Sequence, residues 1–379
     1  MNMRVKLSEL GTVITGNTPS KQEQKYWTSS DIPFIKPDII SQNEITELQS
    51  ANEYVSDAAR SKARIVGKGV VLVTCIGTIG KICLTGRECA FNQQINAIVP
   101  NEKVLPEYLA YCIYYNRYKL AEIANAPVVP IINKSQFEEF YVSIEKDVEL
   151  QRKILLILRR ASALVSYRQH QLQKLDELVK ARFVEMFGEP KSNKSNLVKI
   201  GEIGSLTSGG TPSRIKPEYF KGDIRWYSAG ELNSLYLPDS VEHISKTALK
   251  ESAAKLFNKG TLMIGMYDTA AFKLGILTED SSSNQACANL NPQNDYNVVW
   301  LYYLFDIMKP GFLQERQGVR QKNLSLSKIK EFEVPSAPIG IQNQFAAFVE
   351  RVNKSKAAAQ KALDEAQLLF DSLMQKYFG

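Results

Sequence analysis

Apolar side chains recur at seven-residue intervals along two long stretches of the chain, residues 148–188 and 340–379. The stretches align at an offset of 191 residues, and both end in Phe-Gly. The aligned rows are Leu158, Val165, Leu172, Val179 and Met186 in the first stretch and Val349, Lys356, Leu363, Phe370 and Tyr377 in the second. A heptad row held over five repeats predicts a helix lying along another long helix. Two ordinary core helices are the disfavoured alternative, because such helices average about 11–12 residues.

The segments before the long helices also repeat. At an offset of 193 residues, Thr18-Pro19-Ser20 matches Thr211-Pro212-Ser213, and the glycines before them coincide. Each half then contains a Lys-Gly turn before an apolar strand, followed by an Asn-Gln pair, Asn92-Gln93 or Asn284-Gln285. Short β-branched runs bounded by glycine and proline turns predict strands. A repeat of this extent indicates that the chain contains one kind of module twice.

Both halves change from strands to a helix rich in aromatic residues, over 106–120 and 298–309. These aromatic side chains are expected to form core against the sheet, and stacking on nucleic-acid bases is the alternative. The predicted order is a first module (1–147), a long helix (148–188), a polar linker (189–196), a second module (197–338) and another long helix (339–379).

The repeat suggests that the two long helices pair with each other. A linker of eight residues spans at most roughly 28 Å, which is less than half of the roughly 60 Å that each helix would measure. The short linker therefore favours an antiparallel coiled coil, with the modules at opposite ends and related by a pseudo-twofold axis. The expected fold class is α+β, with two similar mixed α/β modules.

The composition, with 44% hydrophobic and 23% charged residues, is that of a globular protein. No apolar run is long enough to span a membrane, and the N-terminus lacks the apolar region of a signal peptide, so a cytoplasmic location is expected. The five cysteines show no CxxC spacing and only two histidines are present, which disfavours a metal site. The net charge of +7 favours a nucleic-acid partner.

Two similar modules held apart by a stiff rod are suited to duplex DNA. Modules related by a twofold axis meet half-sites about 34–36 Å apart, one helical turn of DNA. The two modules share their glycines and apolar strands but differ in their loops, where contact residues normally lie. Each module is therefore expected to read a different half-site of a split, asymmetric target.

The duplicated Gly-x-Thr-Pro-Ser opening, the Asn-Gln pair, the polar NKS or NLS loop and the two long helices ending in Phe-Gly resemble the specificity (S) subunit of type I restriction–modification systems. The similarity covers the whole chain. It implies two target recognition domains that read a bipartite DNA sequence, with a gap set by the length of the helix pair. It also implies two partner modification subunits, which bind S-adenosylmethionine and methylate adenine at N6, and restriction subunits, which use ATP and Mg²⁺ for cleavage. No cofactor is expected in this chain.

Lys and Arg side chains are expected to bind phosphates, and Arg, Lys, Asn and Gln are expected to read base edges. The candidates in the first module are Lys21, Lys25, Lys36, Arg60, Lys62, Arg64, Lys81 and Lys134. Those in the second are Arg214, Lys216, Arg225, Lys246, Lys250, Lys273, Arg316, Arg320, Gln321, Lys322 and Asn323. The cluster over 316–323 is the strongest candidate because it is dense and rich in base-reading residue types. A merely solvated side chain is the alternative at each position, and the shared Asn-Gln pairs are better explained by structural hydrogen bonds.

The module repeat is not perfect. The turn Thr78-Ile79-Gly80-Lys81 is replaced in the second module by Thr269-Ala270-Ala271-Phe272-Lys273, and the heptad row contains a polar residue, Lys356. These departures leave the frame of the repeat intact.

The sequence contains neither a phosphate-binding GxxxxGK[ST] loop nor an HExxH zinc motif, and two histidines make a Ser-His-Asp triad improbable. The prediction is a non-catalytic DNA-recognition subunit that directs catalysis by its partners. A coiled-coil adaptor that binds other proteins at its two ends is the main alternative. An independent nuclease or methyltransferase would need a catalytic residue set that the sequence does not show.

Overall fold

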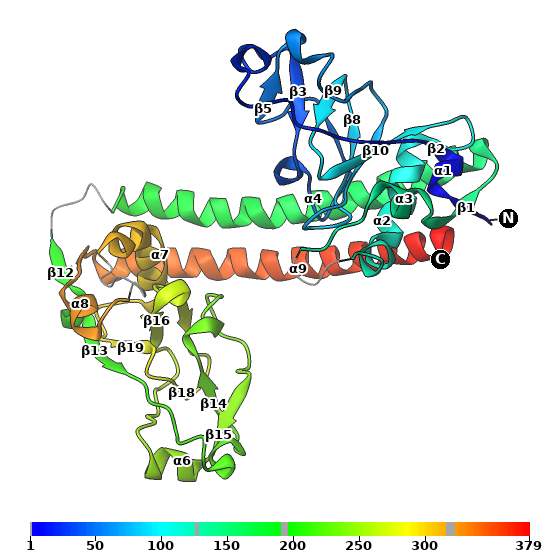
Figure 1. Cartoon of the computed structure of the whole chain (residues 1–379). Helices are drawn as coiled ribbons and strands as arrows, with labels where there is room; N and C mark the ends of the chain where they lie inside the picture. Colours follow the sequence, from blue (N-terminus) through cyan, green and yellow to red (C-terminus); the bar gives the residue numbers. More distant parts are fainter. Residues whose placement is uncertain (1, 126–128, 191–195, 316–322) are drawn as a thin grey trace. The chain divides into compact units, whose positions relative to one another are not determined.

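The computed structural model describes residues 2–125, 129–190, 196–315 and 323–379 (Figure 1). The chain forms two compact units. The first unit comprises residues 1–170 and 360–379, and the second comprises residues 171–359. Each unit therefore contains one module together with part of each long helix, whereas the sequence-based scheme treats the helices as separate segments.

The described residues of the module in the first unit form three sheets, three α-helices and three short 3-10 helices. Its elements in chain order are β1 (Asn2–Lys6), α1 (Leu7–Leu10), β2 (Gly11–Thr15), η1 (Gln24–Tyr26), β3 (Ile32–Ile35), η2 (Pro37–Ile39), β4 (Thr46–Leu48), β5 (Glu53–Val55), η3 (Asp57–Ala59), β6 (Ile65–Val66), β7 (Val71–Thr74), β8 (Ile82–Thr85), β9 (Cys89–Phe91), β10 (Ile95–Pro100), α2 (Pro106–Glu122), α3 (Lys134–Glu138) and β11 (Tyr141–Glu145). The sheet orders are β2-β10-β7-β8-β4, β5-β3-β9-β6 and β1-β11. All four residues of strand β7 are buried, and the first three are apolar.

The module of the second unit repeats this topology with fewer strands. Its elements are β12 (Leu197–Lys199), α5 (Ile200–Ile203), β13 (Gly204–Ser208), η4 (Pro217–Phe220), β14 (Ile224–Tyr227), η5 (Ala229–Glu231), β15 (Glu242–Ile244), α6 (Lys246–Glu251), β16 (Leu262–Gly265), η6 (Asp268–Ala270), β17 (Leu274–Ile276), β18 (Ser282–Ser283), β19 (Cys287–Pro292), α7 (Val298–Gln314), α8 (Leu326–Glu331) and β20 (Glu333–Pro335). The sheet orders are β13-β19-β16-β17, β15-β14-β18 and β12-β20. The predicted duplication of the module is confirmed, although β4 and β6 have no counterpart among the described strands of the second module.

The aromatic helices α2 and α7 form core, as predicted. Tyr108 of α2 is buried, and its ring lies 5.1 Å from that of Phe378 in the same unit. Trp300 and Phe305 of α7 are buried, and their ring centroids lie 5.8 Å from that of Phe187 and 6.3 Å from that of Phe272, respectively. These buried rings are not available for stacking on bases.

The two long helices are α4 (Val148–Phe187) and α9 (Ile339–Phe378). In the first unit, Leu158 from the first half of α4 shares a core with Phe370 and Met374 from the second half of α9. In the second unit, Phe183 of α4 packs edge-to-face on Phe345 of α9, with ring centroids 5.2 Å apart. Because the early half of one helix pairs with the late half of the other, the pairing within each unit is antiparallel. The pseudo-twofold relation between the modules stays a prediction.

The polar interruption in the heptad row is accounted for by a contact between the helices. Lys356 of α9 forms an ion pair with Asp176 of α4 within the second unit. The lysine therefore lies at the helix pair without an unpaired charge.

A buried glutamine fixes the start of α4 to the first module. Gln151 is fully buried, and its Oε1 accepts a hydrogen bond of 2.9 Å from the backbone N–H of Leu105, the N-cap residue of α2. Its Nε2 donates to the carbonyl oxygens of Lys103 and Glu145, at 3.0 and 2.7 Å. One side chain thus joins α4, α2 and the end of β11.

A buried glutamine fixes the start of α9 to the second module in the same way. Gln342 of α9 is fully buried, and its Oε1 accepts a hydrogen bond of 2.8 Å from the N–H of Asn297, the N-cap residue of α7. Its Nε2 donates to the carbonyl oxygens of Asp295 and Ala337, at 3.2 and 2.7 Å.

In the described part of the chain, no helix is both long and apolar enough to cross a membrane.

Candidate nucleic-acid interface

The shared Thr-Pro-Ser and Asn-Gln motifs are joined in both modules. The hydroxyl of Thr18 donates to Oε1 of Gln93 at 2.7 Å, and Thr211 makes the same bond to Gln285. A contact that is identical in both modules cannot distinguish two different half-sites. These hydrogen bonds support the structural interpretation of the Asn-Gln pairs.

The glycine before each Thr-Pro-Ser motif is required by close approach of the chain. A Cβ atom on Gly16 would lie 2.2 Å from the carbonyl oxygen of Asn92, and one on Gly209 would lie 2.2 Å from Oγ of Ser283. Neither position has room for a larger residue. The motif therefore marks where the loop after β2 or β13 crosses the smaller sheet.

Lys81 and Lys273 also occupy equivalent positions. Nζ of Lys81 donates to the carbonyl oxygen of Pro37 in η2 at 3.0 Å, and Nζ of Lys273 approaches that of Gly230 in η5 at 3.4 Å. Each lysine thus holds the short helix after the first strand of the smaller sheet. Their common role in the frame makes them weaker candidates for base reading than their charge suggests.

The altered turn before Lys273 keeps its backbone shape. Gly80 has φ of 81°, and Phe272 has φ of 54° at the matching place. An L-residue is strained in this region. The Phe272 ring is fully buried, with the rings of Phe312 and Phe332 at centroid distances of 4.6 and 6.1 Å. Burial of this ring offsets the backbone strain.

In the first module, two candidate lysines share one carboxylate. Lys21 donates to Glu53 at 2.7 Å while its Nζ lies 3.8 Å from the centre of the Trp27 ring, and Lys36 donates to the other oxygen of Glu53. Hydrogen bonds from Lys21 and then Lys36 hold the pKa of Glu53 below its usual value. The carboxylate therefore remains charged and fixes both lysines near β5.

The second module has an ion pair at the same place. Arg214 donates to Glu242 of β15 at 2.8 Å, and its guanidinium lies 4.1 Å from the centre of the Phe220 ring. Hydrogen bonding from Arg214 lowers the pKa of Glu242. Lys21 and Arg214 thus have the same two kinds of neighbour, a carboxylate and an aromatic ring.

Other predicted cations are also paired within their module. The pairs are Lys25 with Glu23, Arg60 with Asp57 and Glu88, Lys134 with Glu138, Lys216 with Glu251, and Arg225 with Asp239 and Glu279. Exposed ion pairs are worth only about 0–1 kcal/mol, so most of these cations can exchange onto phosphate at small cost. Arg225 is the least available because its side chain is only 22% exposed.

Four candidates are open. The side chains of Lys62, Arg64, Lys246 and Lys250 are exposed and form no ion pair with any residue that the structure describes. The side-chain amide of Asn17 holds the backbone between the first two, donating to the carbonyl of Lys62 and accepting from the N–H of Arg64, both at 2.6 Å. These lysines and this arginine are the candidates best placed to bind phosphate directly.

The cluster over 316–323 falls largely outside the described residues. Arg316, Arg320, Gln321 and Lys322 lie there, so their role stays a prediction. Asn323 is described and lines a cavity of about 420 Å³ together with residues such as Tyr267 and Gln285.

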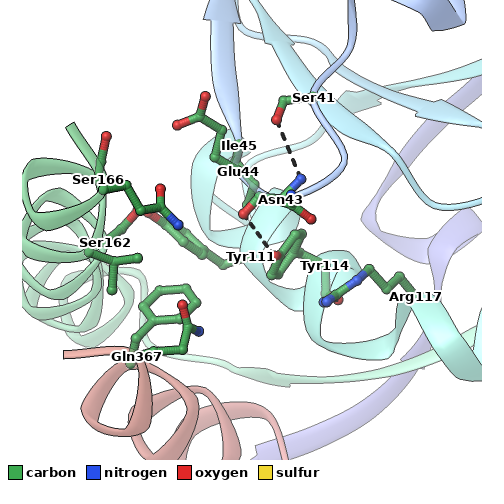
Figure 2. A pocket seen from close by; sticks show the side chains of 13 residues that line it. Ser41, Asn43, Glu44, Ile45, Tyr111, Tyr114, Arg117, Ser162, Ser166 and Gln367 are labelled. Atoms are coloured by element: carbon green, nitrogen blue, oxygen red, sulfur yellow. Dashed lines mark hydrogen bonds between the residues drawn. The ribbon is translucent and has the colours of Figure 1, made fainter. Parts of the chain in front are cut away.

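A second cavity, of about 540 Å³, lies in the first unit between the module and the long helices (Figure 2). Ser162 and Ser166 of α4 and Gln367 of α9 line one side, and Tyr114 of α2 donates to the carbonyl of Asn43 at 3.0 Å on the other. No histidine or cysteine is among the described residues that line it, and Glu44 is the acidic residue among them.

Metal or thiol chemistry is not apparent. Within the described ranges, no three His, Cys, Asp or Glu side chains are grouped so as to bind a metal ion. The five cysteines are free and buried, and burial raises the pKa of Cys75 and Cys89 to about 12. These two thiols are therefore protonated at neutral pH.

Comparisons with known proteins agree with this picture. A family model for the type I restriction modification DNA specificity domain matches twice, over residues 2–177 and 193–366. The type I restriction enzyme MjaIX specificity subunit of Methanocaldococcus jannaschii is 22% identical, over 98% of this chain and 91% of that protein. The type I restriction enzyme HindI specificity subunit of Haemophilus influenzae is 38% identical over 104 residues, which is 27% of this chain and 22% of that protein.

A solved structure has the same fold. The type I restriction–modification S subunit of M. genitalium superposes with a TM-score of 0.58 at 13% identity, over 100% of this chain and 96% of that one. At this identity the likeness supports the fold alone.

Proposed function

Because this chain belongs to the type I restriction–modification DNA specificity family, we propose that it reads a bipartite, asymmetric DNA target and directs adenine N6 methylation by partner subunits. One module would bind each half-site. The chain itself would supply recognition, and the partners would supply the chemistry and act with it in the cytoplasm.

The observation that carries this proposal is that the two modules share the same framework hydrogen bonds but differ in their exposed cations. The Thr-Gln hydrogen bond and the pinned lysine recur in both modules. The open cations do not recur: Lys62 and Arg64 follow η3, whereas Lys246 and Lys250 lie on α6. A common frame with different contact residues is expected of two readers with different half-sites.

The charge of the chain supports binding to DNA. Its net charge is +7, and the open side chains are Lys and Arg. Each phosphate neutralised releases counterions, so the affinity should fall with salt by about 0.9 log units per log unit of salt and per contact. Base reading would then rest on the loops around these cations.

The long helices support a fixed gap between the half-sites. Each is a continuous helix of 40 residues that belongs partly to the first unit and partly to the second. We propose that helix length sets the number of unread base pairs. The adaptor alternative lacks a supporting observation of its own and is an outcome of the test below.

We propose that two modification subunits bind S-adenosylmethionine and methylate the target. Restriction subunits, where present, would use ATP and Mg²⁺ to cleave DNA. No cofactor is proposed for this chain.

The test is to purify the chain with its modification subunit and to map methylated adenines on genomic DNA by sequencing. The expected result is two short half-sites separated by a constant number of unspecified bases. A single continuous motif, or complete absence of methylation and of salt-sensitive DNA binding, would contradict the proposal, and the latter would favour the adaptor.

A further inference from the structure

We propose that four side chains beside the duplicated ion pair read bases: Gln22 and Asn52 in the first module, and Ile215 and Val241 in the second. The pair in the first module would recognise adenine, and the pair in the second would recognise the methyl group of thymine. This inference rests on the proposed function, and it names residues that charge and motif did not reveal.

The first of the two positions follows the cation of the ion pair. Gln22 comes directly after Lys21, and Ile215 comes directly after Arg214. The two cations are held alike, each by a carboxylate and over an aromatic ring. Gln22 and Ile215 therefore occupy matching positions next to the cation in the shared frame.

The second position precedes the carboxylate. Asn52 comes directly before Glu53 at the start of β5, and Val241 comes directly before Glu242 at the start of β15. Strands β5 and β15 pair antiparallel with β3 and β14, respectively. In each module, one position is therefore adjacent to the cation of the ion pair and the other is adjacent to its carboxylate.

The backbone around these positions is also equivalent. The backbone N–H of Tyr26 donates to the carbonyl oxygen of Glu23 at 3.0 Å, and the N–H of Tyr219 donates to that of Lys216 at the same distance. The carbonyl oxygen of each tyrosine accepts a hydrogen bond of 2.9 Å from a serine N–H, that of Ser56 in the first module and that of Ser245 in the second. The matching of residues between modules thus rests on hydrogen bonds as well as on alignment.

The aliphatic pair is unusually exposed. Ile215 is 90% and Val241 is 84% exposed, the two highest values for large apolar side chains in the described part of the chain. Exposed aliphatic surface gains nothing for folding, since burial is what stabilises it by about 25 cal/mol per Å². Both side chains are therefore accessible to a partner.

The backbone that presents this pair is fixed in advance. The N–H of Val241 donates to Oε1 of Glu231 at 2.9 Å, and the neighbouring Ser240 hydroxyl donates to the carbonyl of Glu242 at 2.6 Å. Beside Ile215, the backbone N–H of Lys216 donates to the carbonyl oxygen of Ser213 at 3.3 Å. A fixed backbone loses little entropy on binding, which is a property of preorganised contact residues.

Duplex DNA is the occupant that the surroundings favour. Lys216 and Arg214 flank Ile215, and Lys246 and Lys250 extend from α6, which packs beside η4. A protein partner would be expected to meet an apolar patch with few cations. In both units this part of the smaller sheet lies on the side of the module remote from the long helices (Figure 1).

The chemistry of each pair matches one base. Gln and Asn amides bind the N6 and N7 atoms of adenine with two hydrogen bonds in the major groove, where the C5-methyl group of thymine offers an apolar contact. An identical frame carrying amides in one module and aliphatic groups in the other would thus give different half-sites. The difference lies in side chains that leave the fold unchanged.

The test for Ile215 and Val241 uses the chain in complex with its modification subunits. After the methylated target is mapped, each thymine is replaced in turn by deoxyuridine, which lacks only the methyl group, and Kd is measured at constant salt. The wild-type complex should lose about fourfold in affinity per contacted methyl group, as expected for one buried methyl-sized group. Ile215→Ala and Val241→Ala should each abolish the loss at one position, whereas Leu256→Ala, also exposed in the second module, should keep the wild-type pattern.

The first module provides an independent arm. Gln22→Ala and Asn52→Ala should weaken binding to the target by about 5- to 150-fold and remove discrimination at one A·T pair each. Gln42→Ala, which alters another exposed amide of the first module, is the matched control and should bind as the wild type does. These effects should fall in one half-site and those of Ile215 and Val241 in the other.

Three results would overturn the inference: no thymine sensitive to loss of its methyl group, the same deoxyuridine pattern in wild type and variants, or variants that lose the modification subunit while their DNA pattern is unchanged. A bipartite methylation motif combined with any of these contradicts this inference alone. Absence of a bipartite motif contradicts the proposed function as well, so the two failures are distinguishable.

Discussion

Replacement of Gln342 by leucine tests how each long helix is fixed to its module. Leucine keeps most of the volume of the side chain but deletes three hydrogen bonds: one accepted from the N–H of Asn297, and two donated to the carbonyls of Asp295 and Ala337. Because Asn297 is the N-cap residue of α7, the substitution also loosens the start of the helix that carries the aromatic core. Gln342 is fully buried, so water does not replace the lost partners without rearrangement.

The magnitude follows from these three bonds. A typical intramolecular hydrogen bond contributes about 1 kcal/mol net, so Gln342→Leu should destabilise the second unit by about 3 kcal/mol. For a unit of this size, each 1 kcal/mol lowers Tm by about 2–4 °C, so the transition of that unit should fall by about 6–12 °C.

Differential scanning calorimetry of the full chain measures the effect. Gln344→Leu is the matched control, because it makes the same replacement two residues away on the exposed face of α9, and it should change stability by less than about 0.5 kcal/mol. Gln151→Leu should act on the first unit as Gln342→Leu acts on the second. A loss below about 1 kcal/mol for Gln342→Leu would refute the idea that the buried amide locks the helix.

Three further predictions concern charge and spacing. The double variant Lys62→Gln with Arg64→Gln should weaken DNA binding equally for all sequences and lower the slope of log K against log salt by about 2. Lys81→Met, in contrast, should lower Tm and leave this slope unchanged. Titrations at several salt concentrations measure the slope, and a double variant with the wild-type slope would count against phosphate contact. Lys21 holds the pKa of Glu53 below its usual value, so the carboxylate contributes stability at neutral pH that is lost as pH falls through its folded-state pKa. In urea unfolding below about pH 4, the free energy of unfolding should therefore fall more steeply with decreasing pH for wild type than for Glu53→Gln. Parallel pH profiles of the two proteins would contradict this. Insertion of one heptad into a long helix adds about 10 Å, so the methylated motif should gain about three unread base pairs with both half-sites unchanged; a change in either half-site would contradict the spacer role.

The architecture was predictable because its signals are local and repeated. The heptad rows predict α4 and α9, and the short linker at 189–196 predicts the antiparallel pairing seen within each unit. The repeated Thr-Pro-Ser and Asn-Gln motifs predict a duplicated module, and their common hydrogen bonds confirm that they belong to its frame.

The candidate interface was less predictable because its determinants are distant in sequence. Lys21 is paired with Glu53, a contact across 32 positions that no local pattern indicates. The sequence aligns the turns that end in Lys81 and Lys273, but the framework role of the two lysines becomes visible only from the carbonyl oxygen that each contacts. A list of basic residues therefore contains frame residues as well as open ones.

Other residues were overlooked because their type points to another role. Gln151 and Gln342 align at the same offset as the heptads. Glutamine is usually exposed, so the burial of these two side chains becomes evident only in the structure. Isoleucine is a residue type that is usually buried, so the sequence alone does not mark Ile215 as a surface residue. It is nevertheless the most exposed large apolar side chain that the structure describes.

The most direct test of the central claim is to exchange the first module and map the methylated adenines again. Residues 1–145 would be replaced by the matching segment of another specificity subunit, and the hybrid would be purified with the same modification subunit. Division of recognition between two modules predicts that one half-site changes to that of the donor, while the other half-site and the gap stay as they were. A hybrid that changes both half-sites, or neither, would contradict the claim that each module reads its own half of the target.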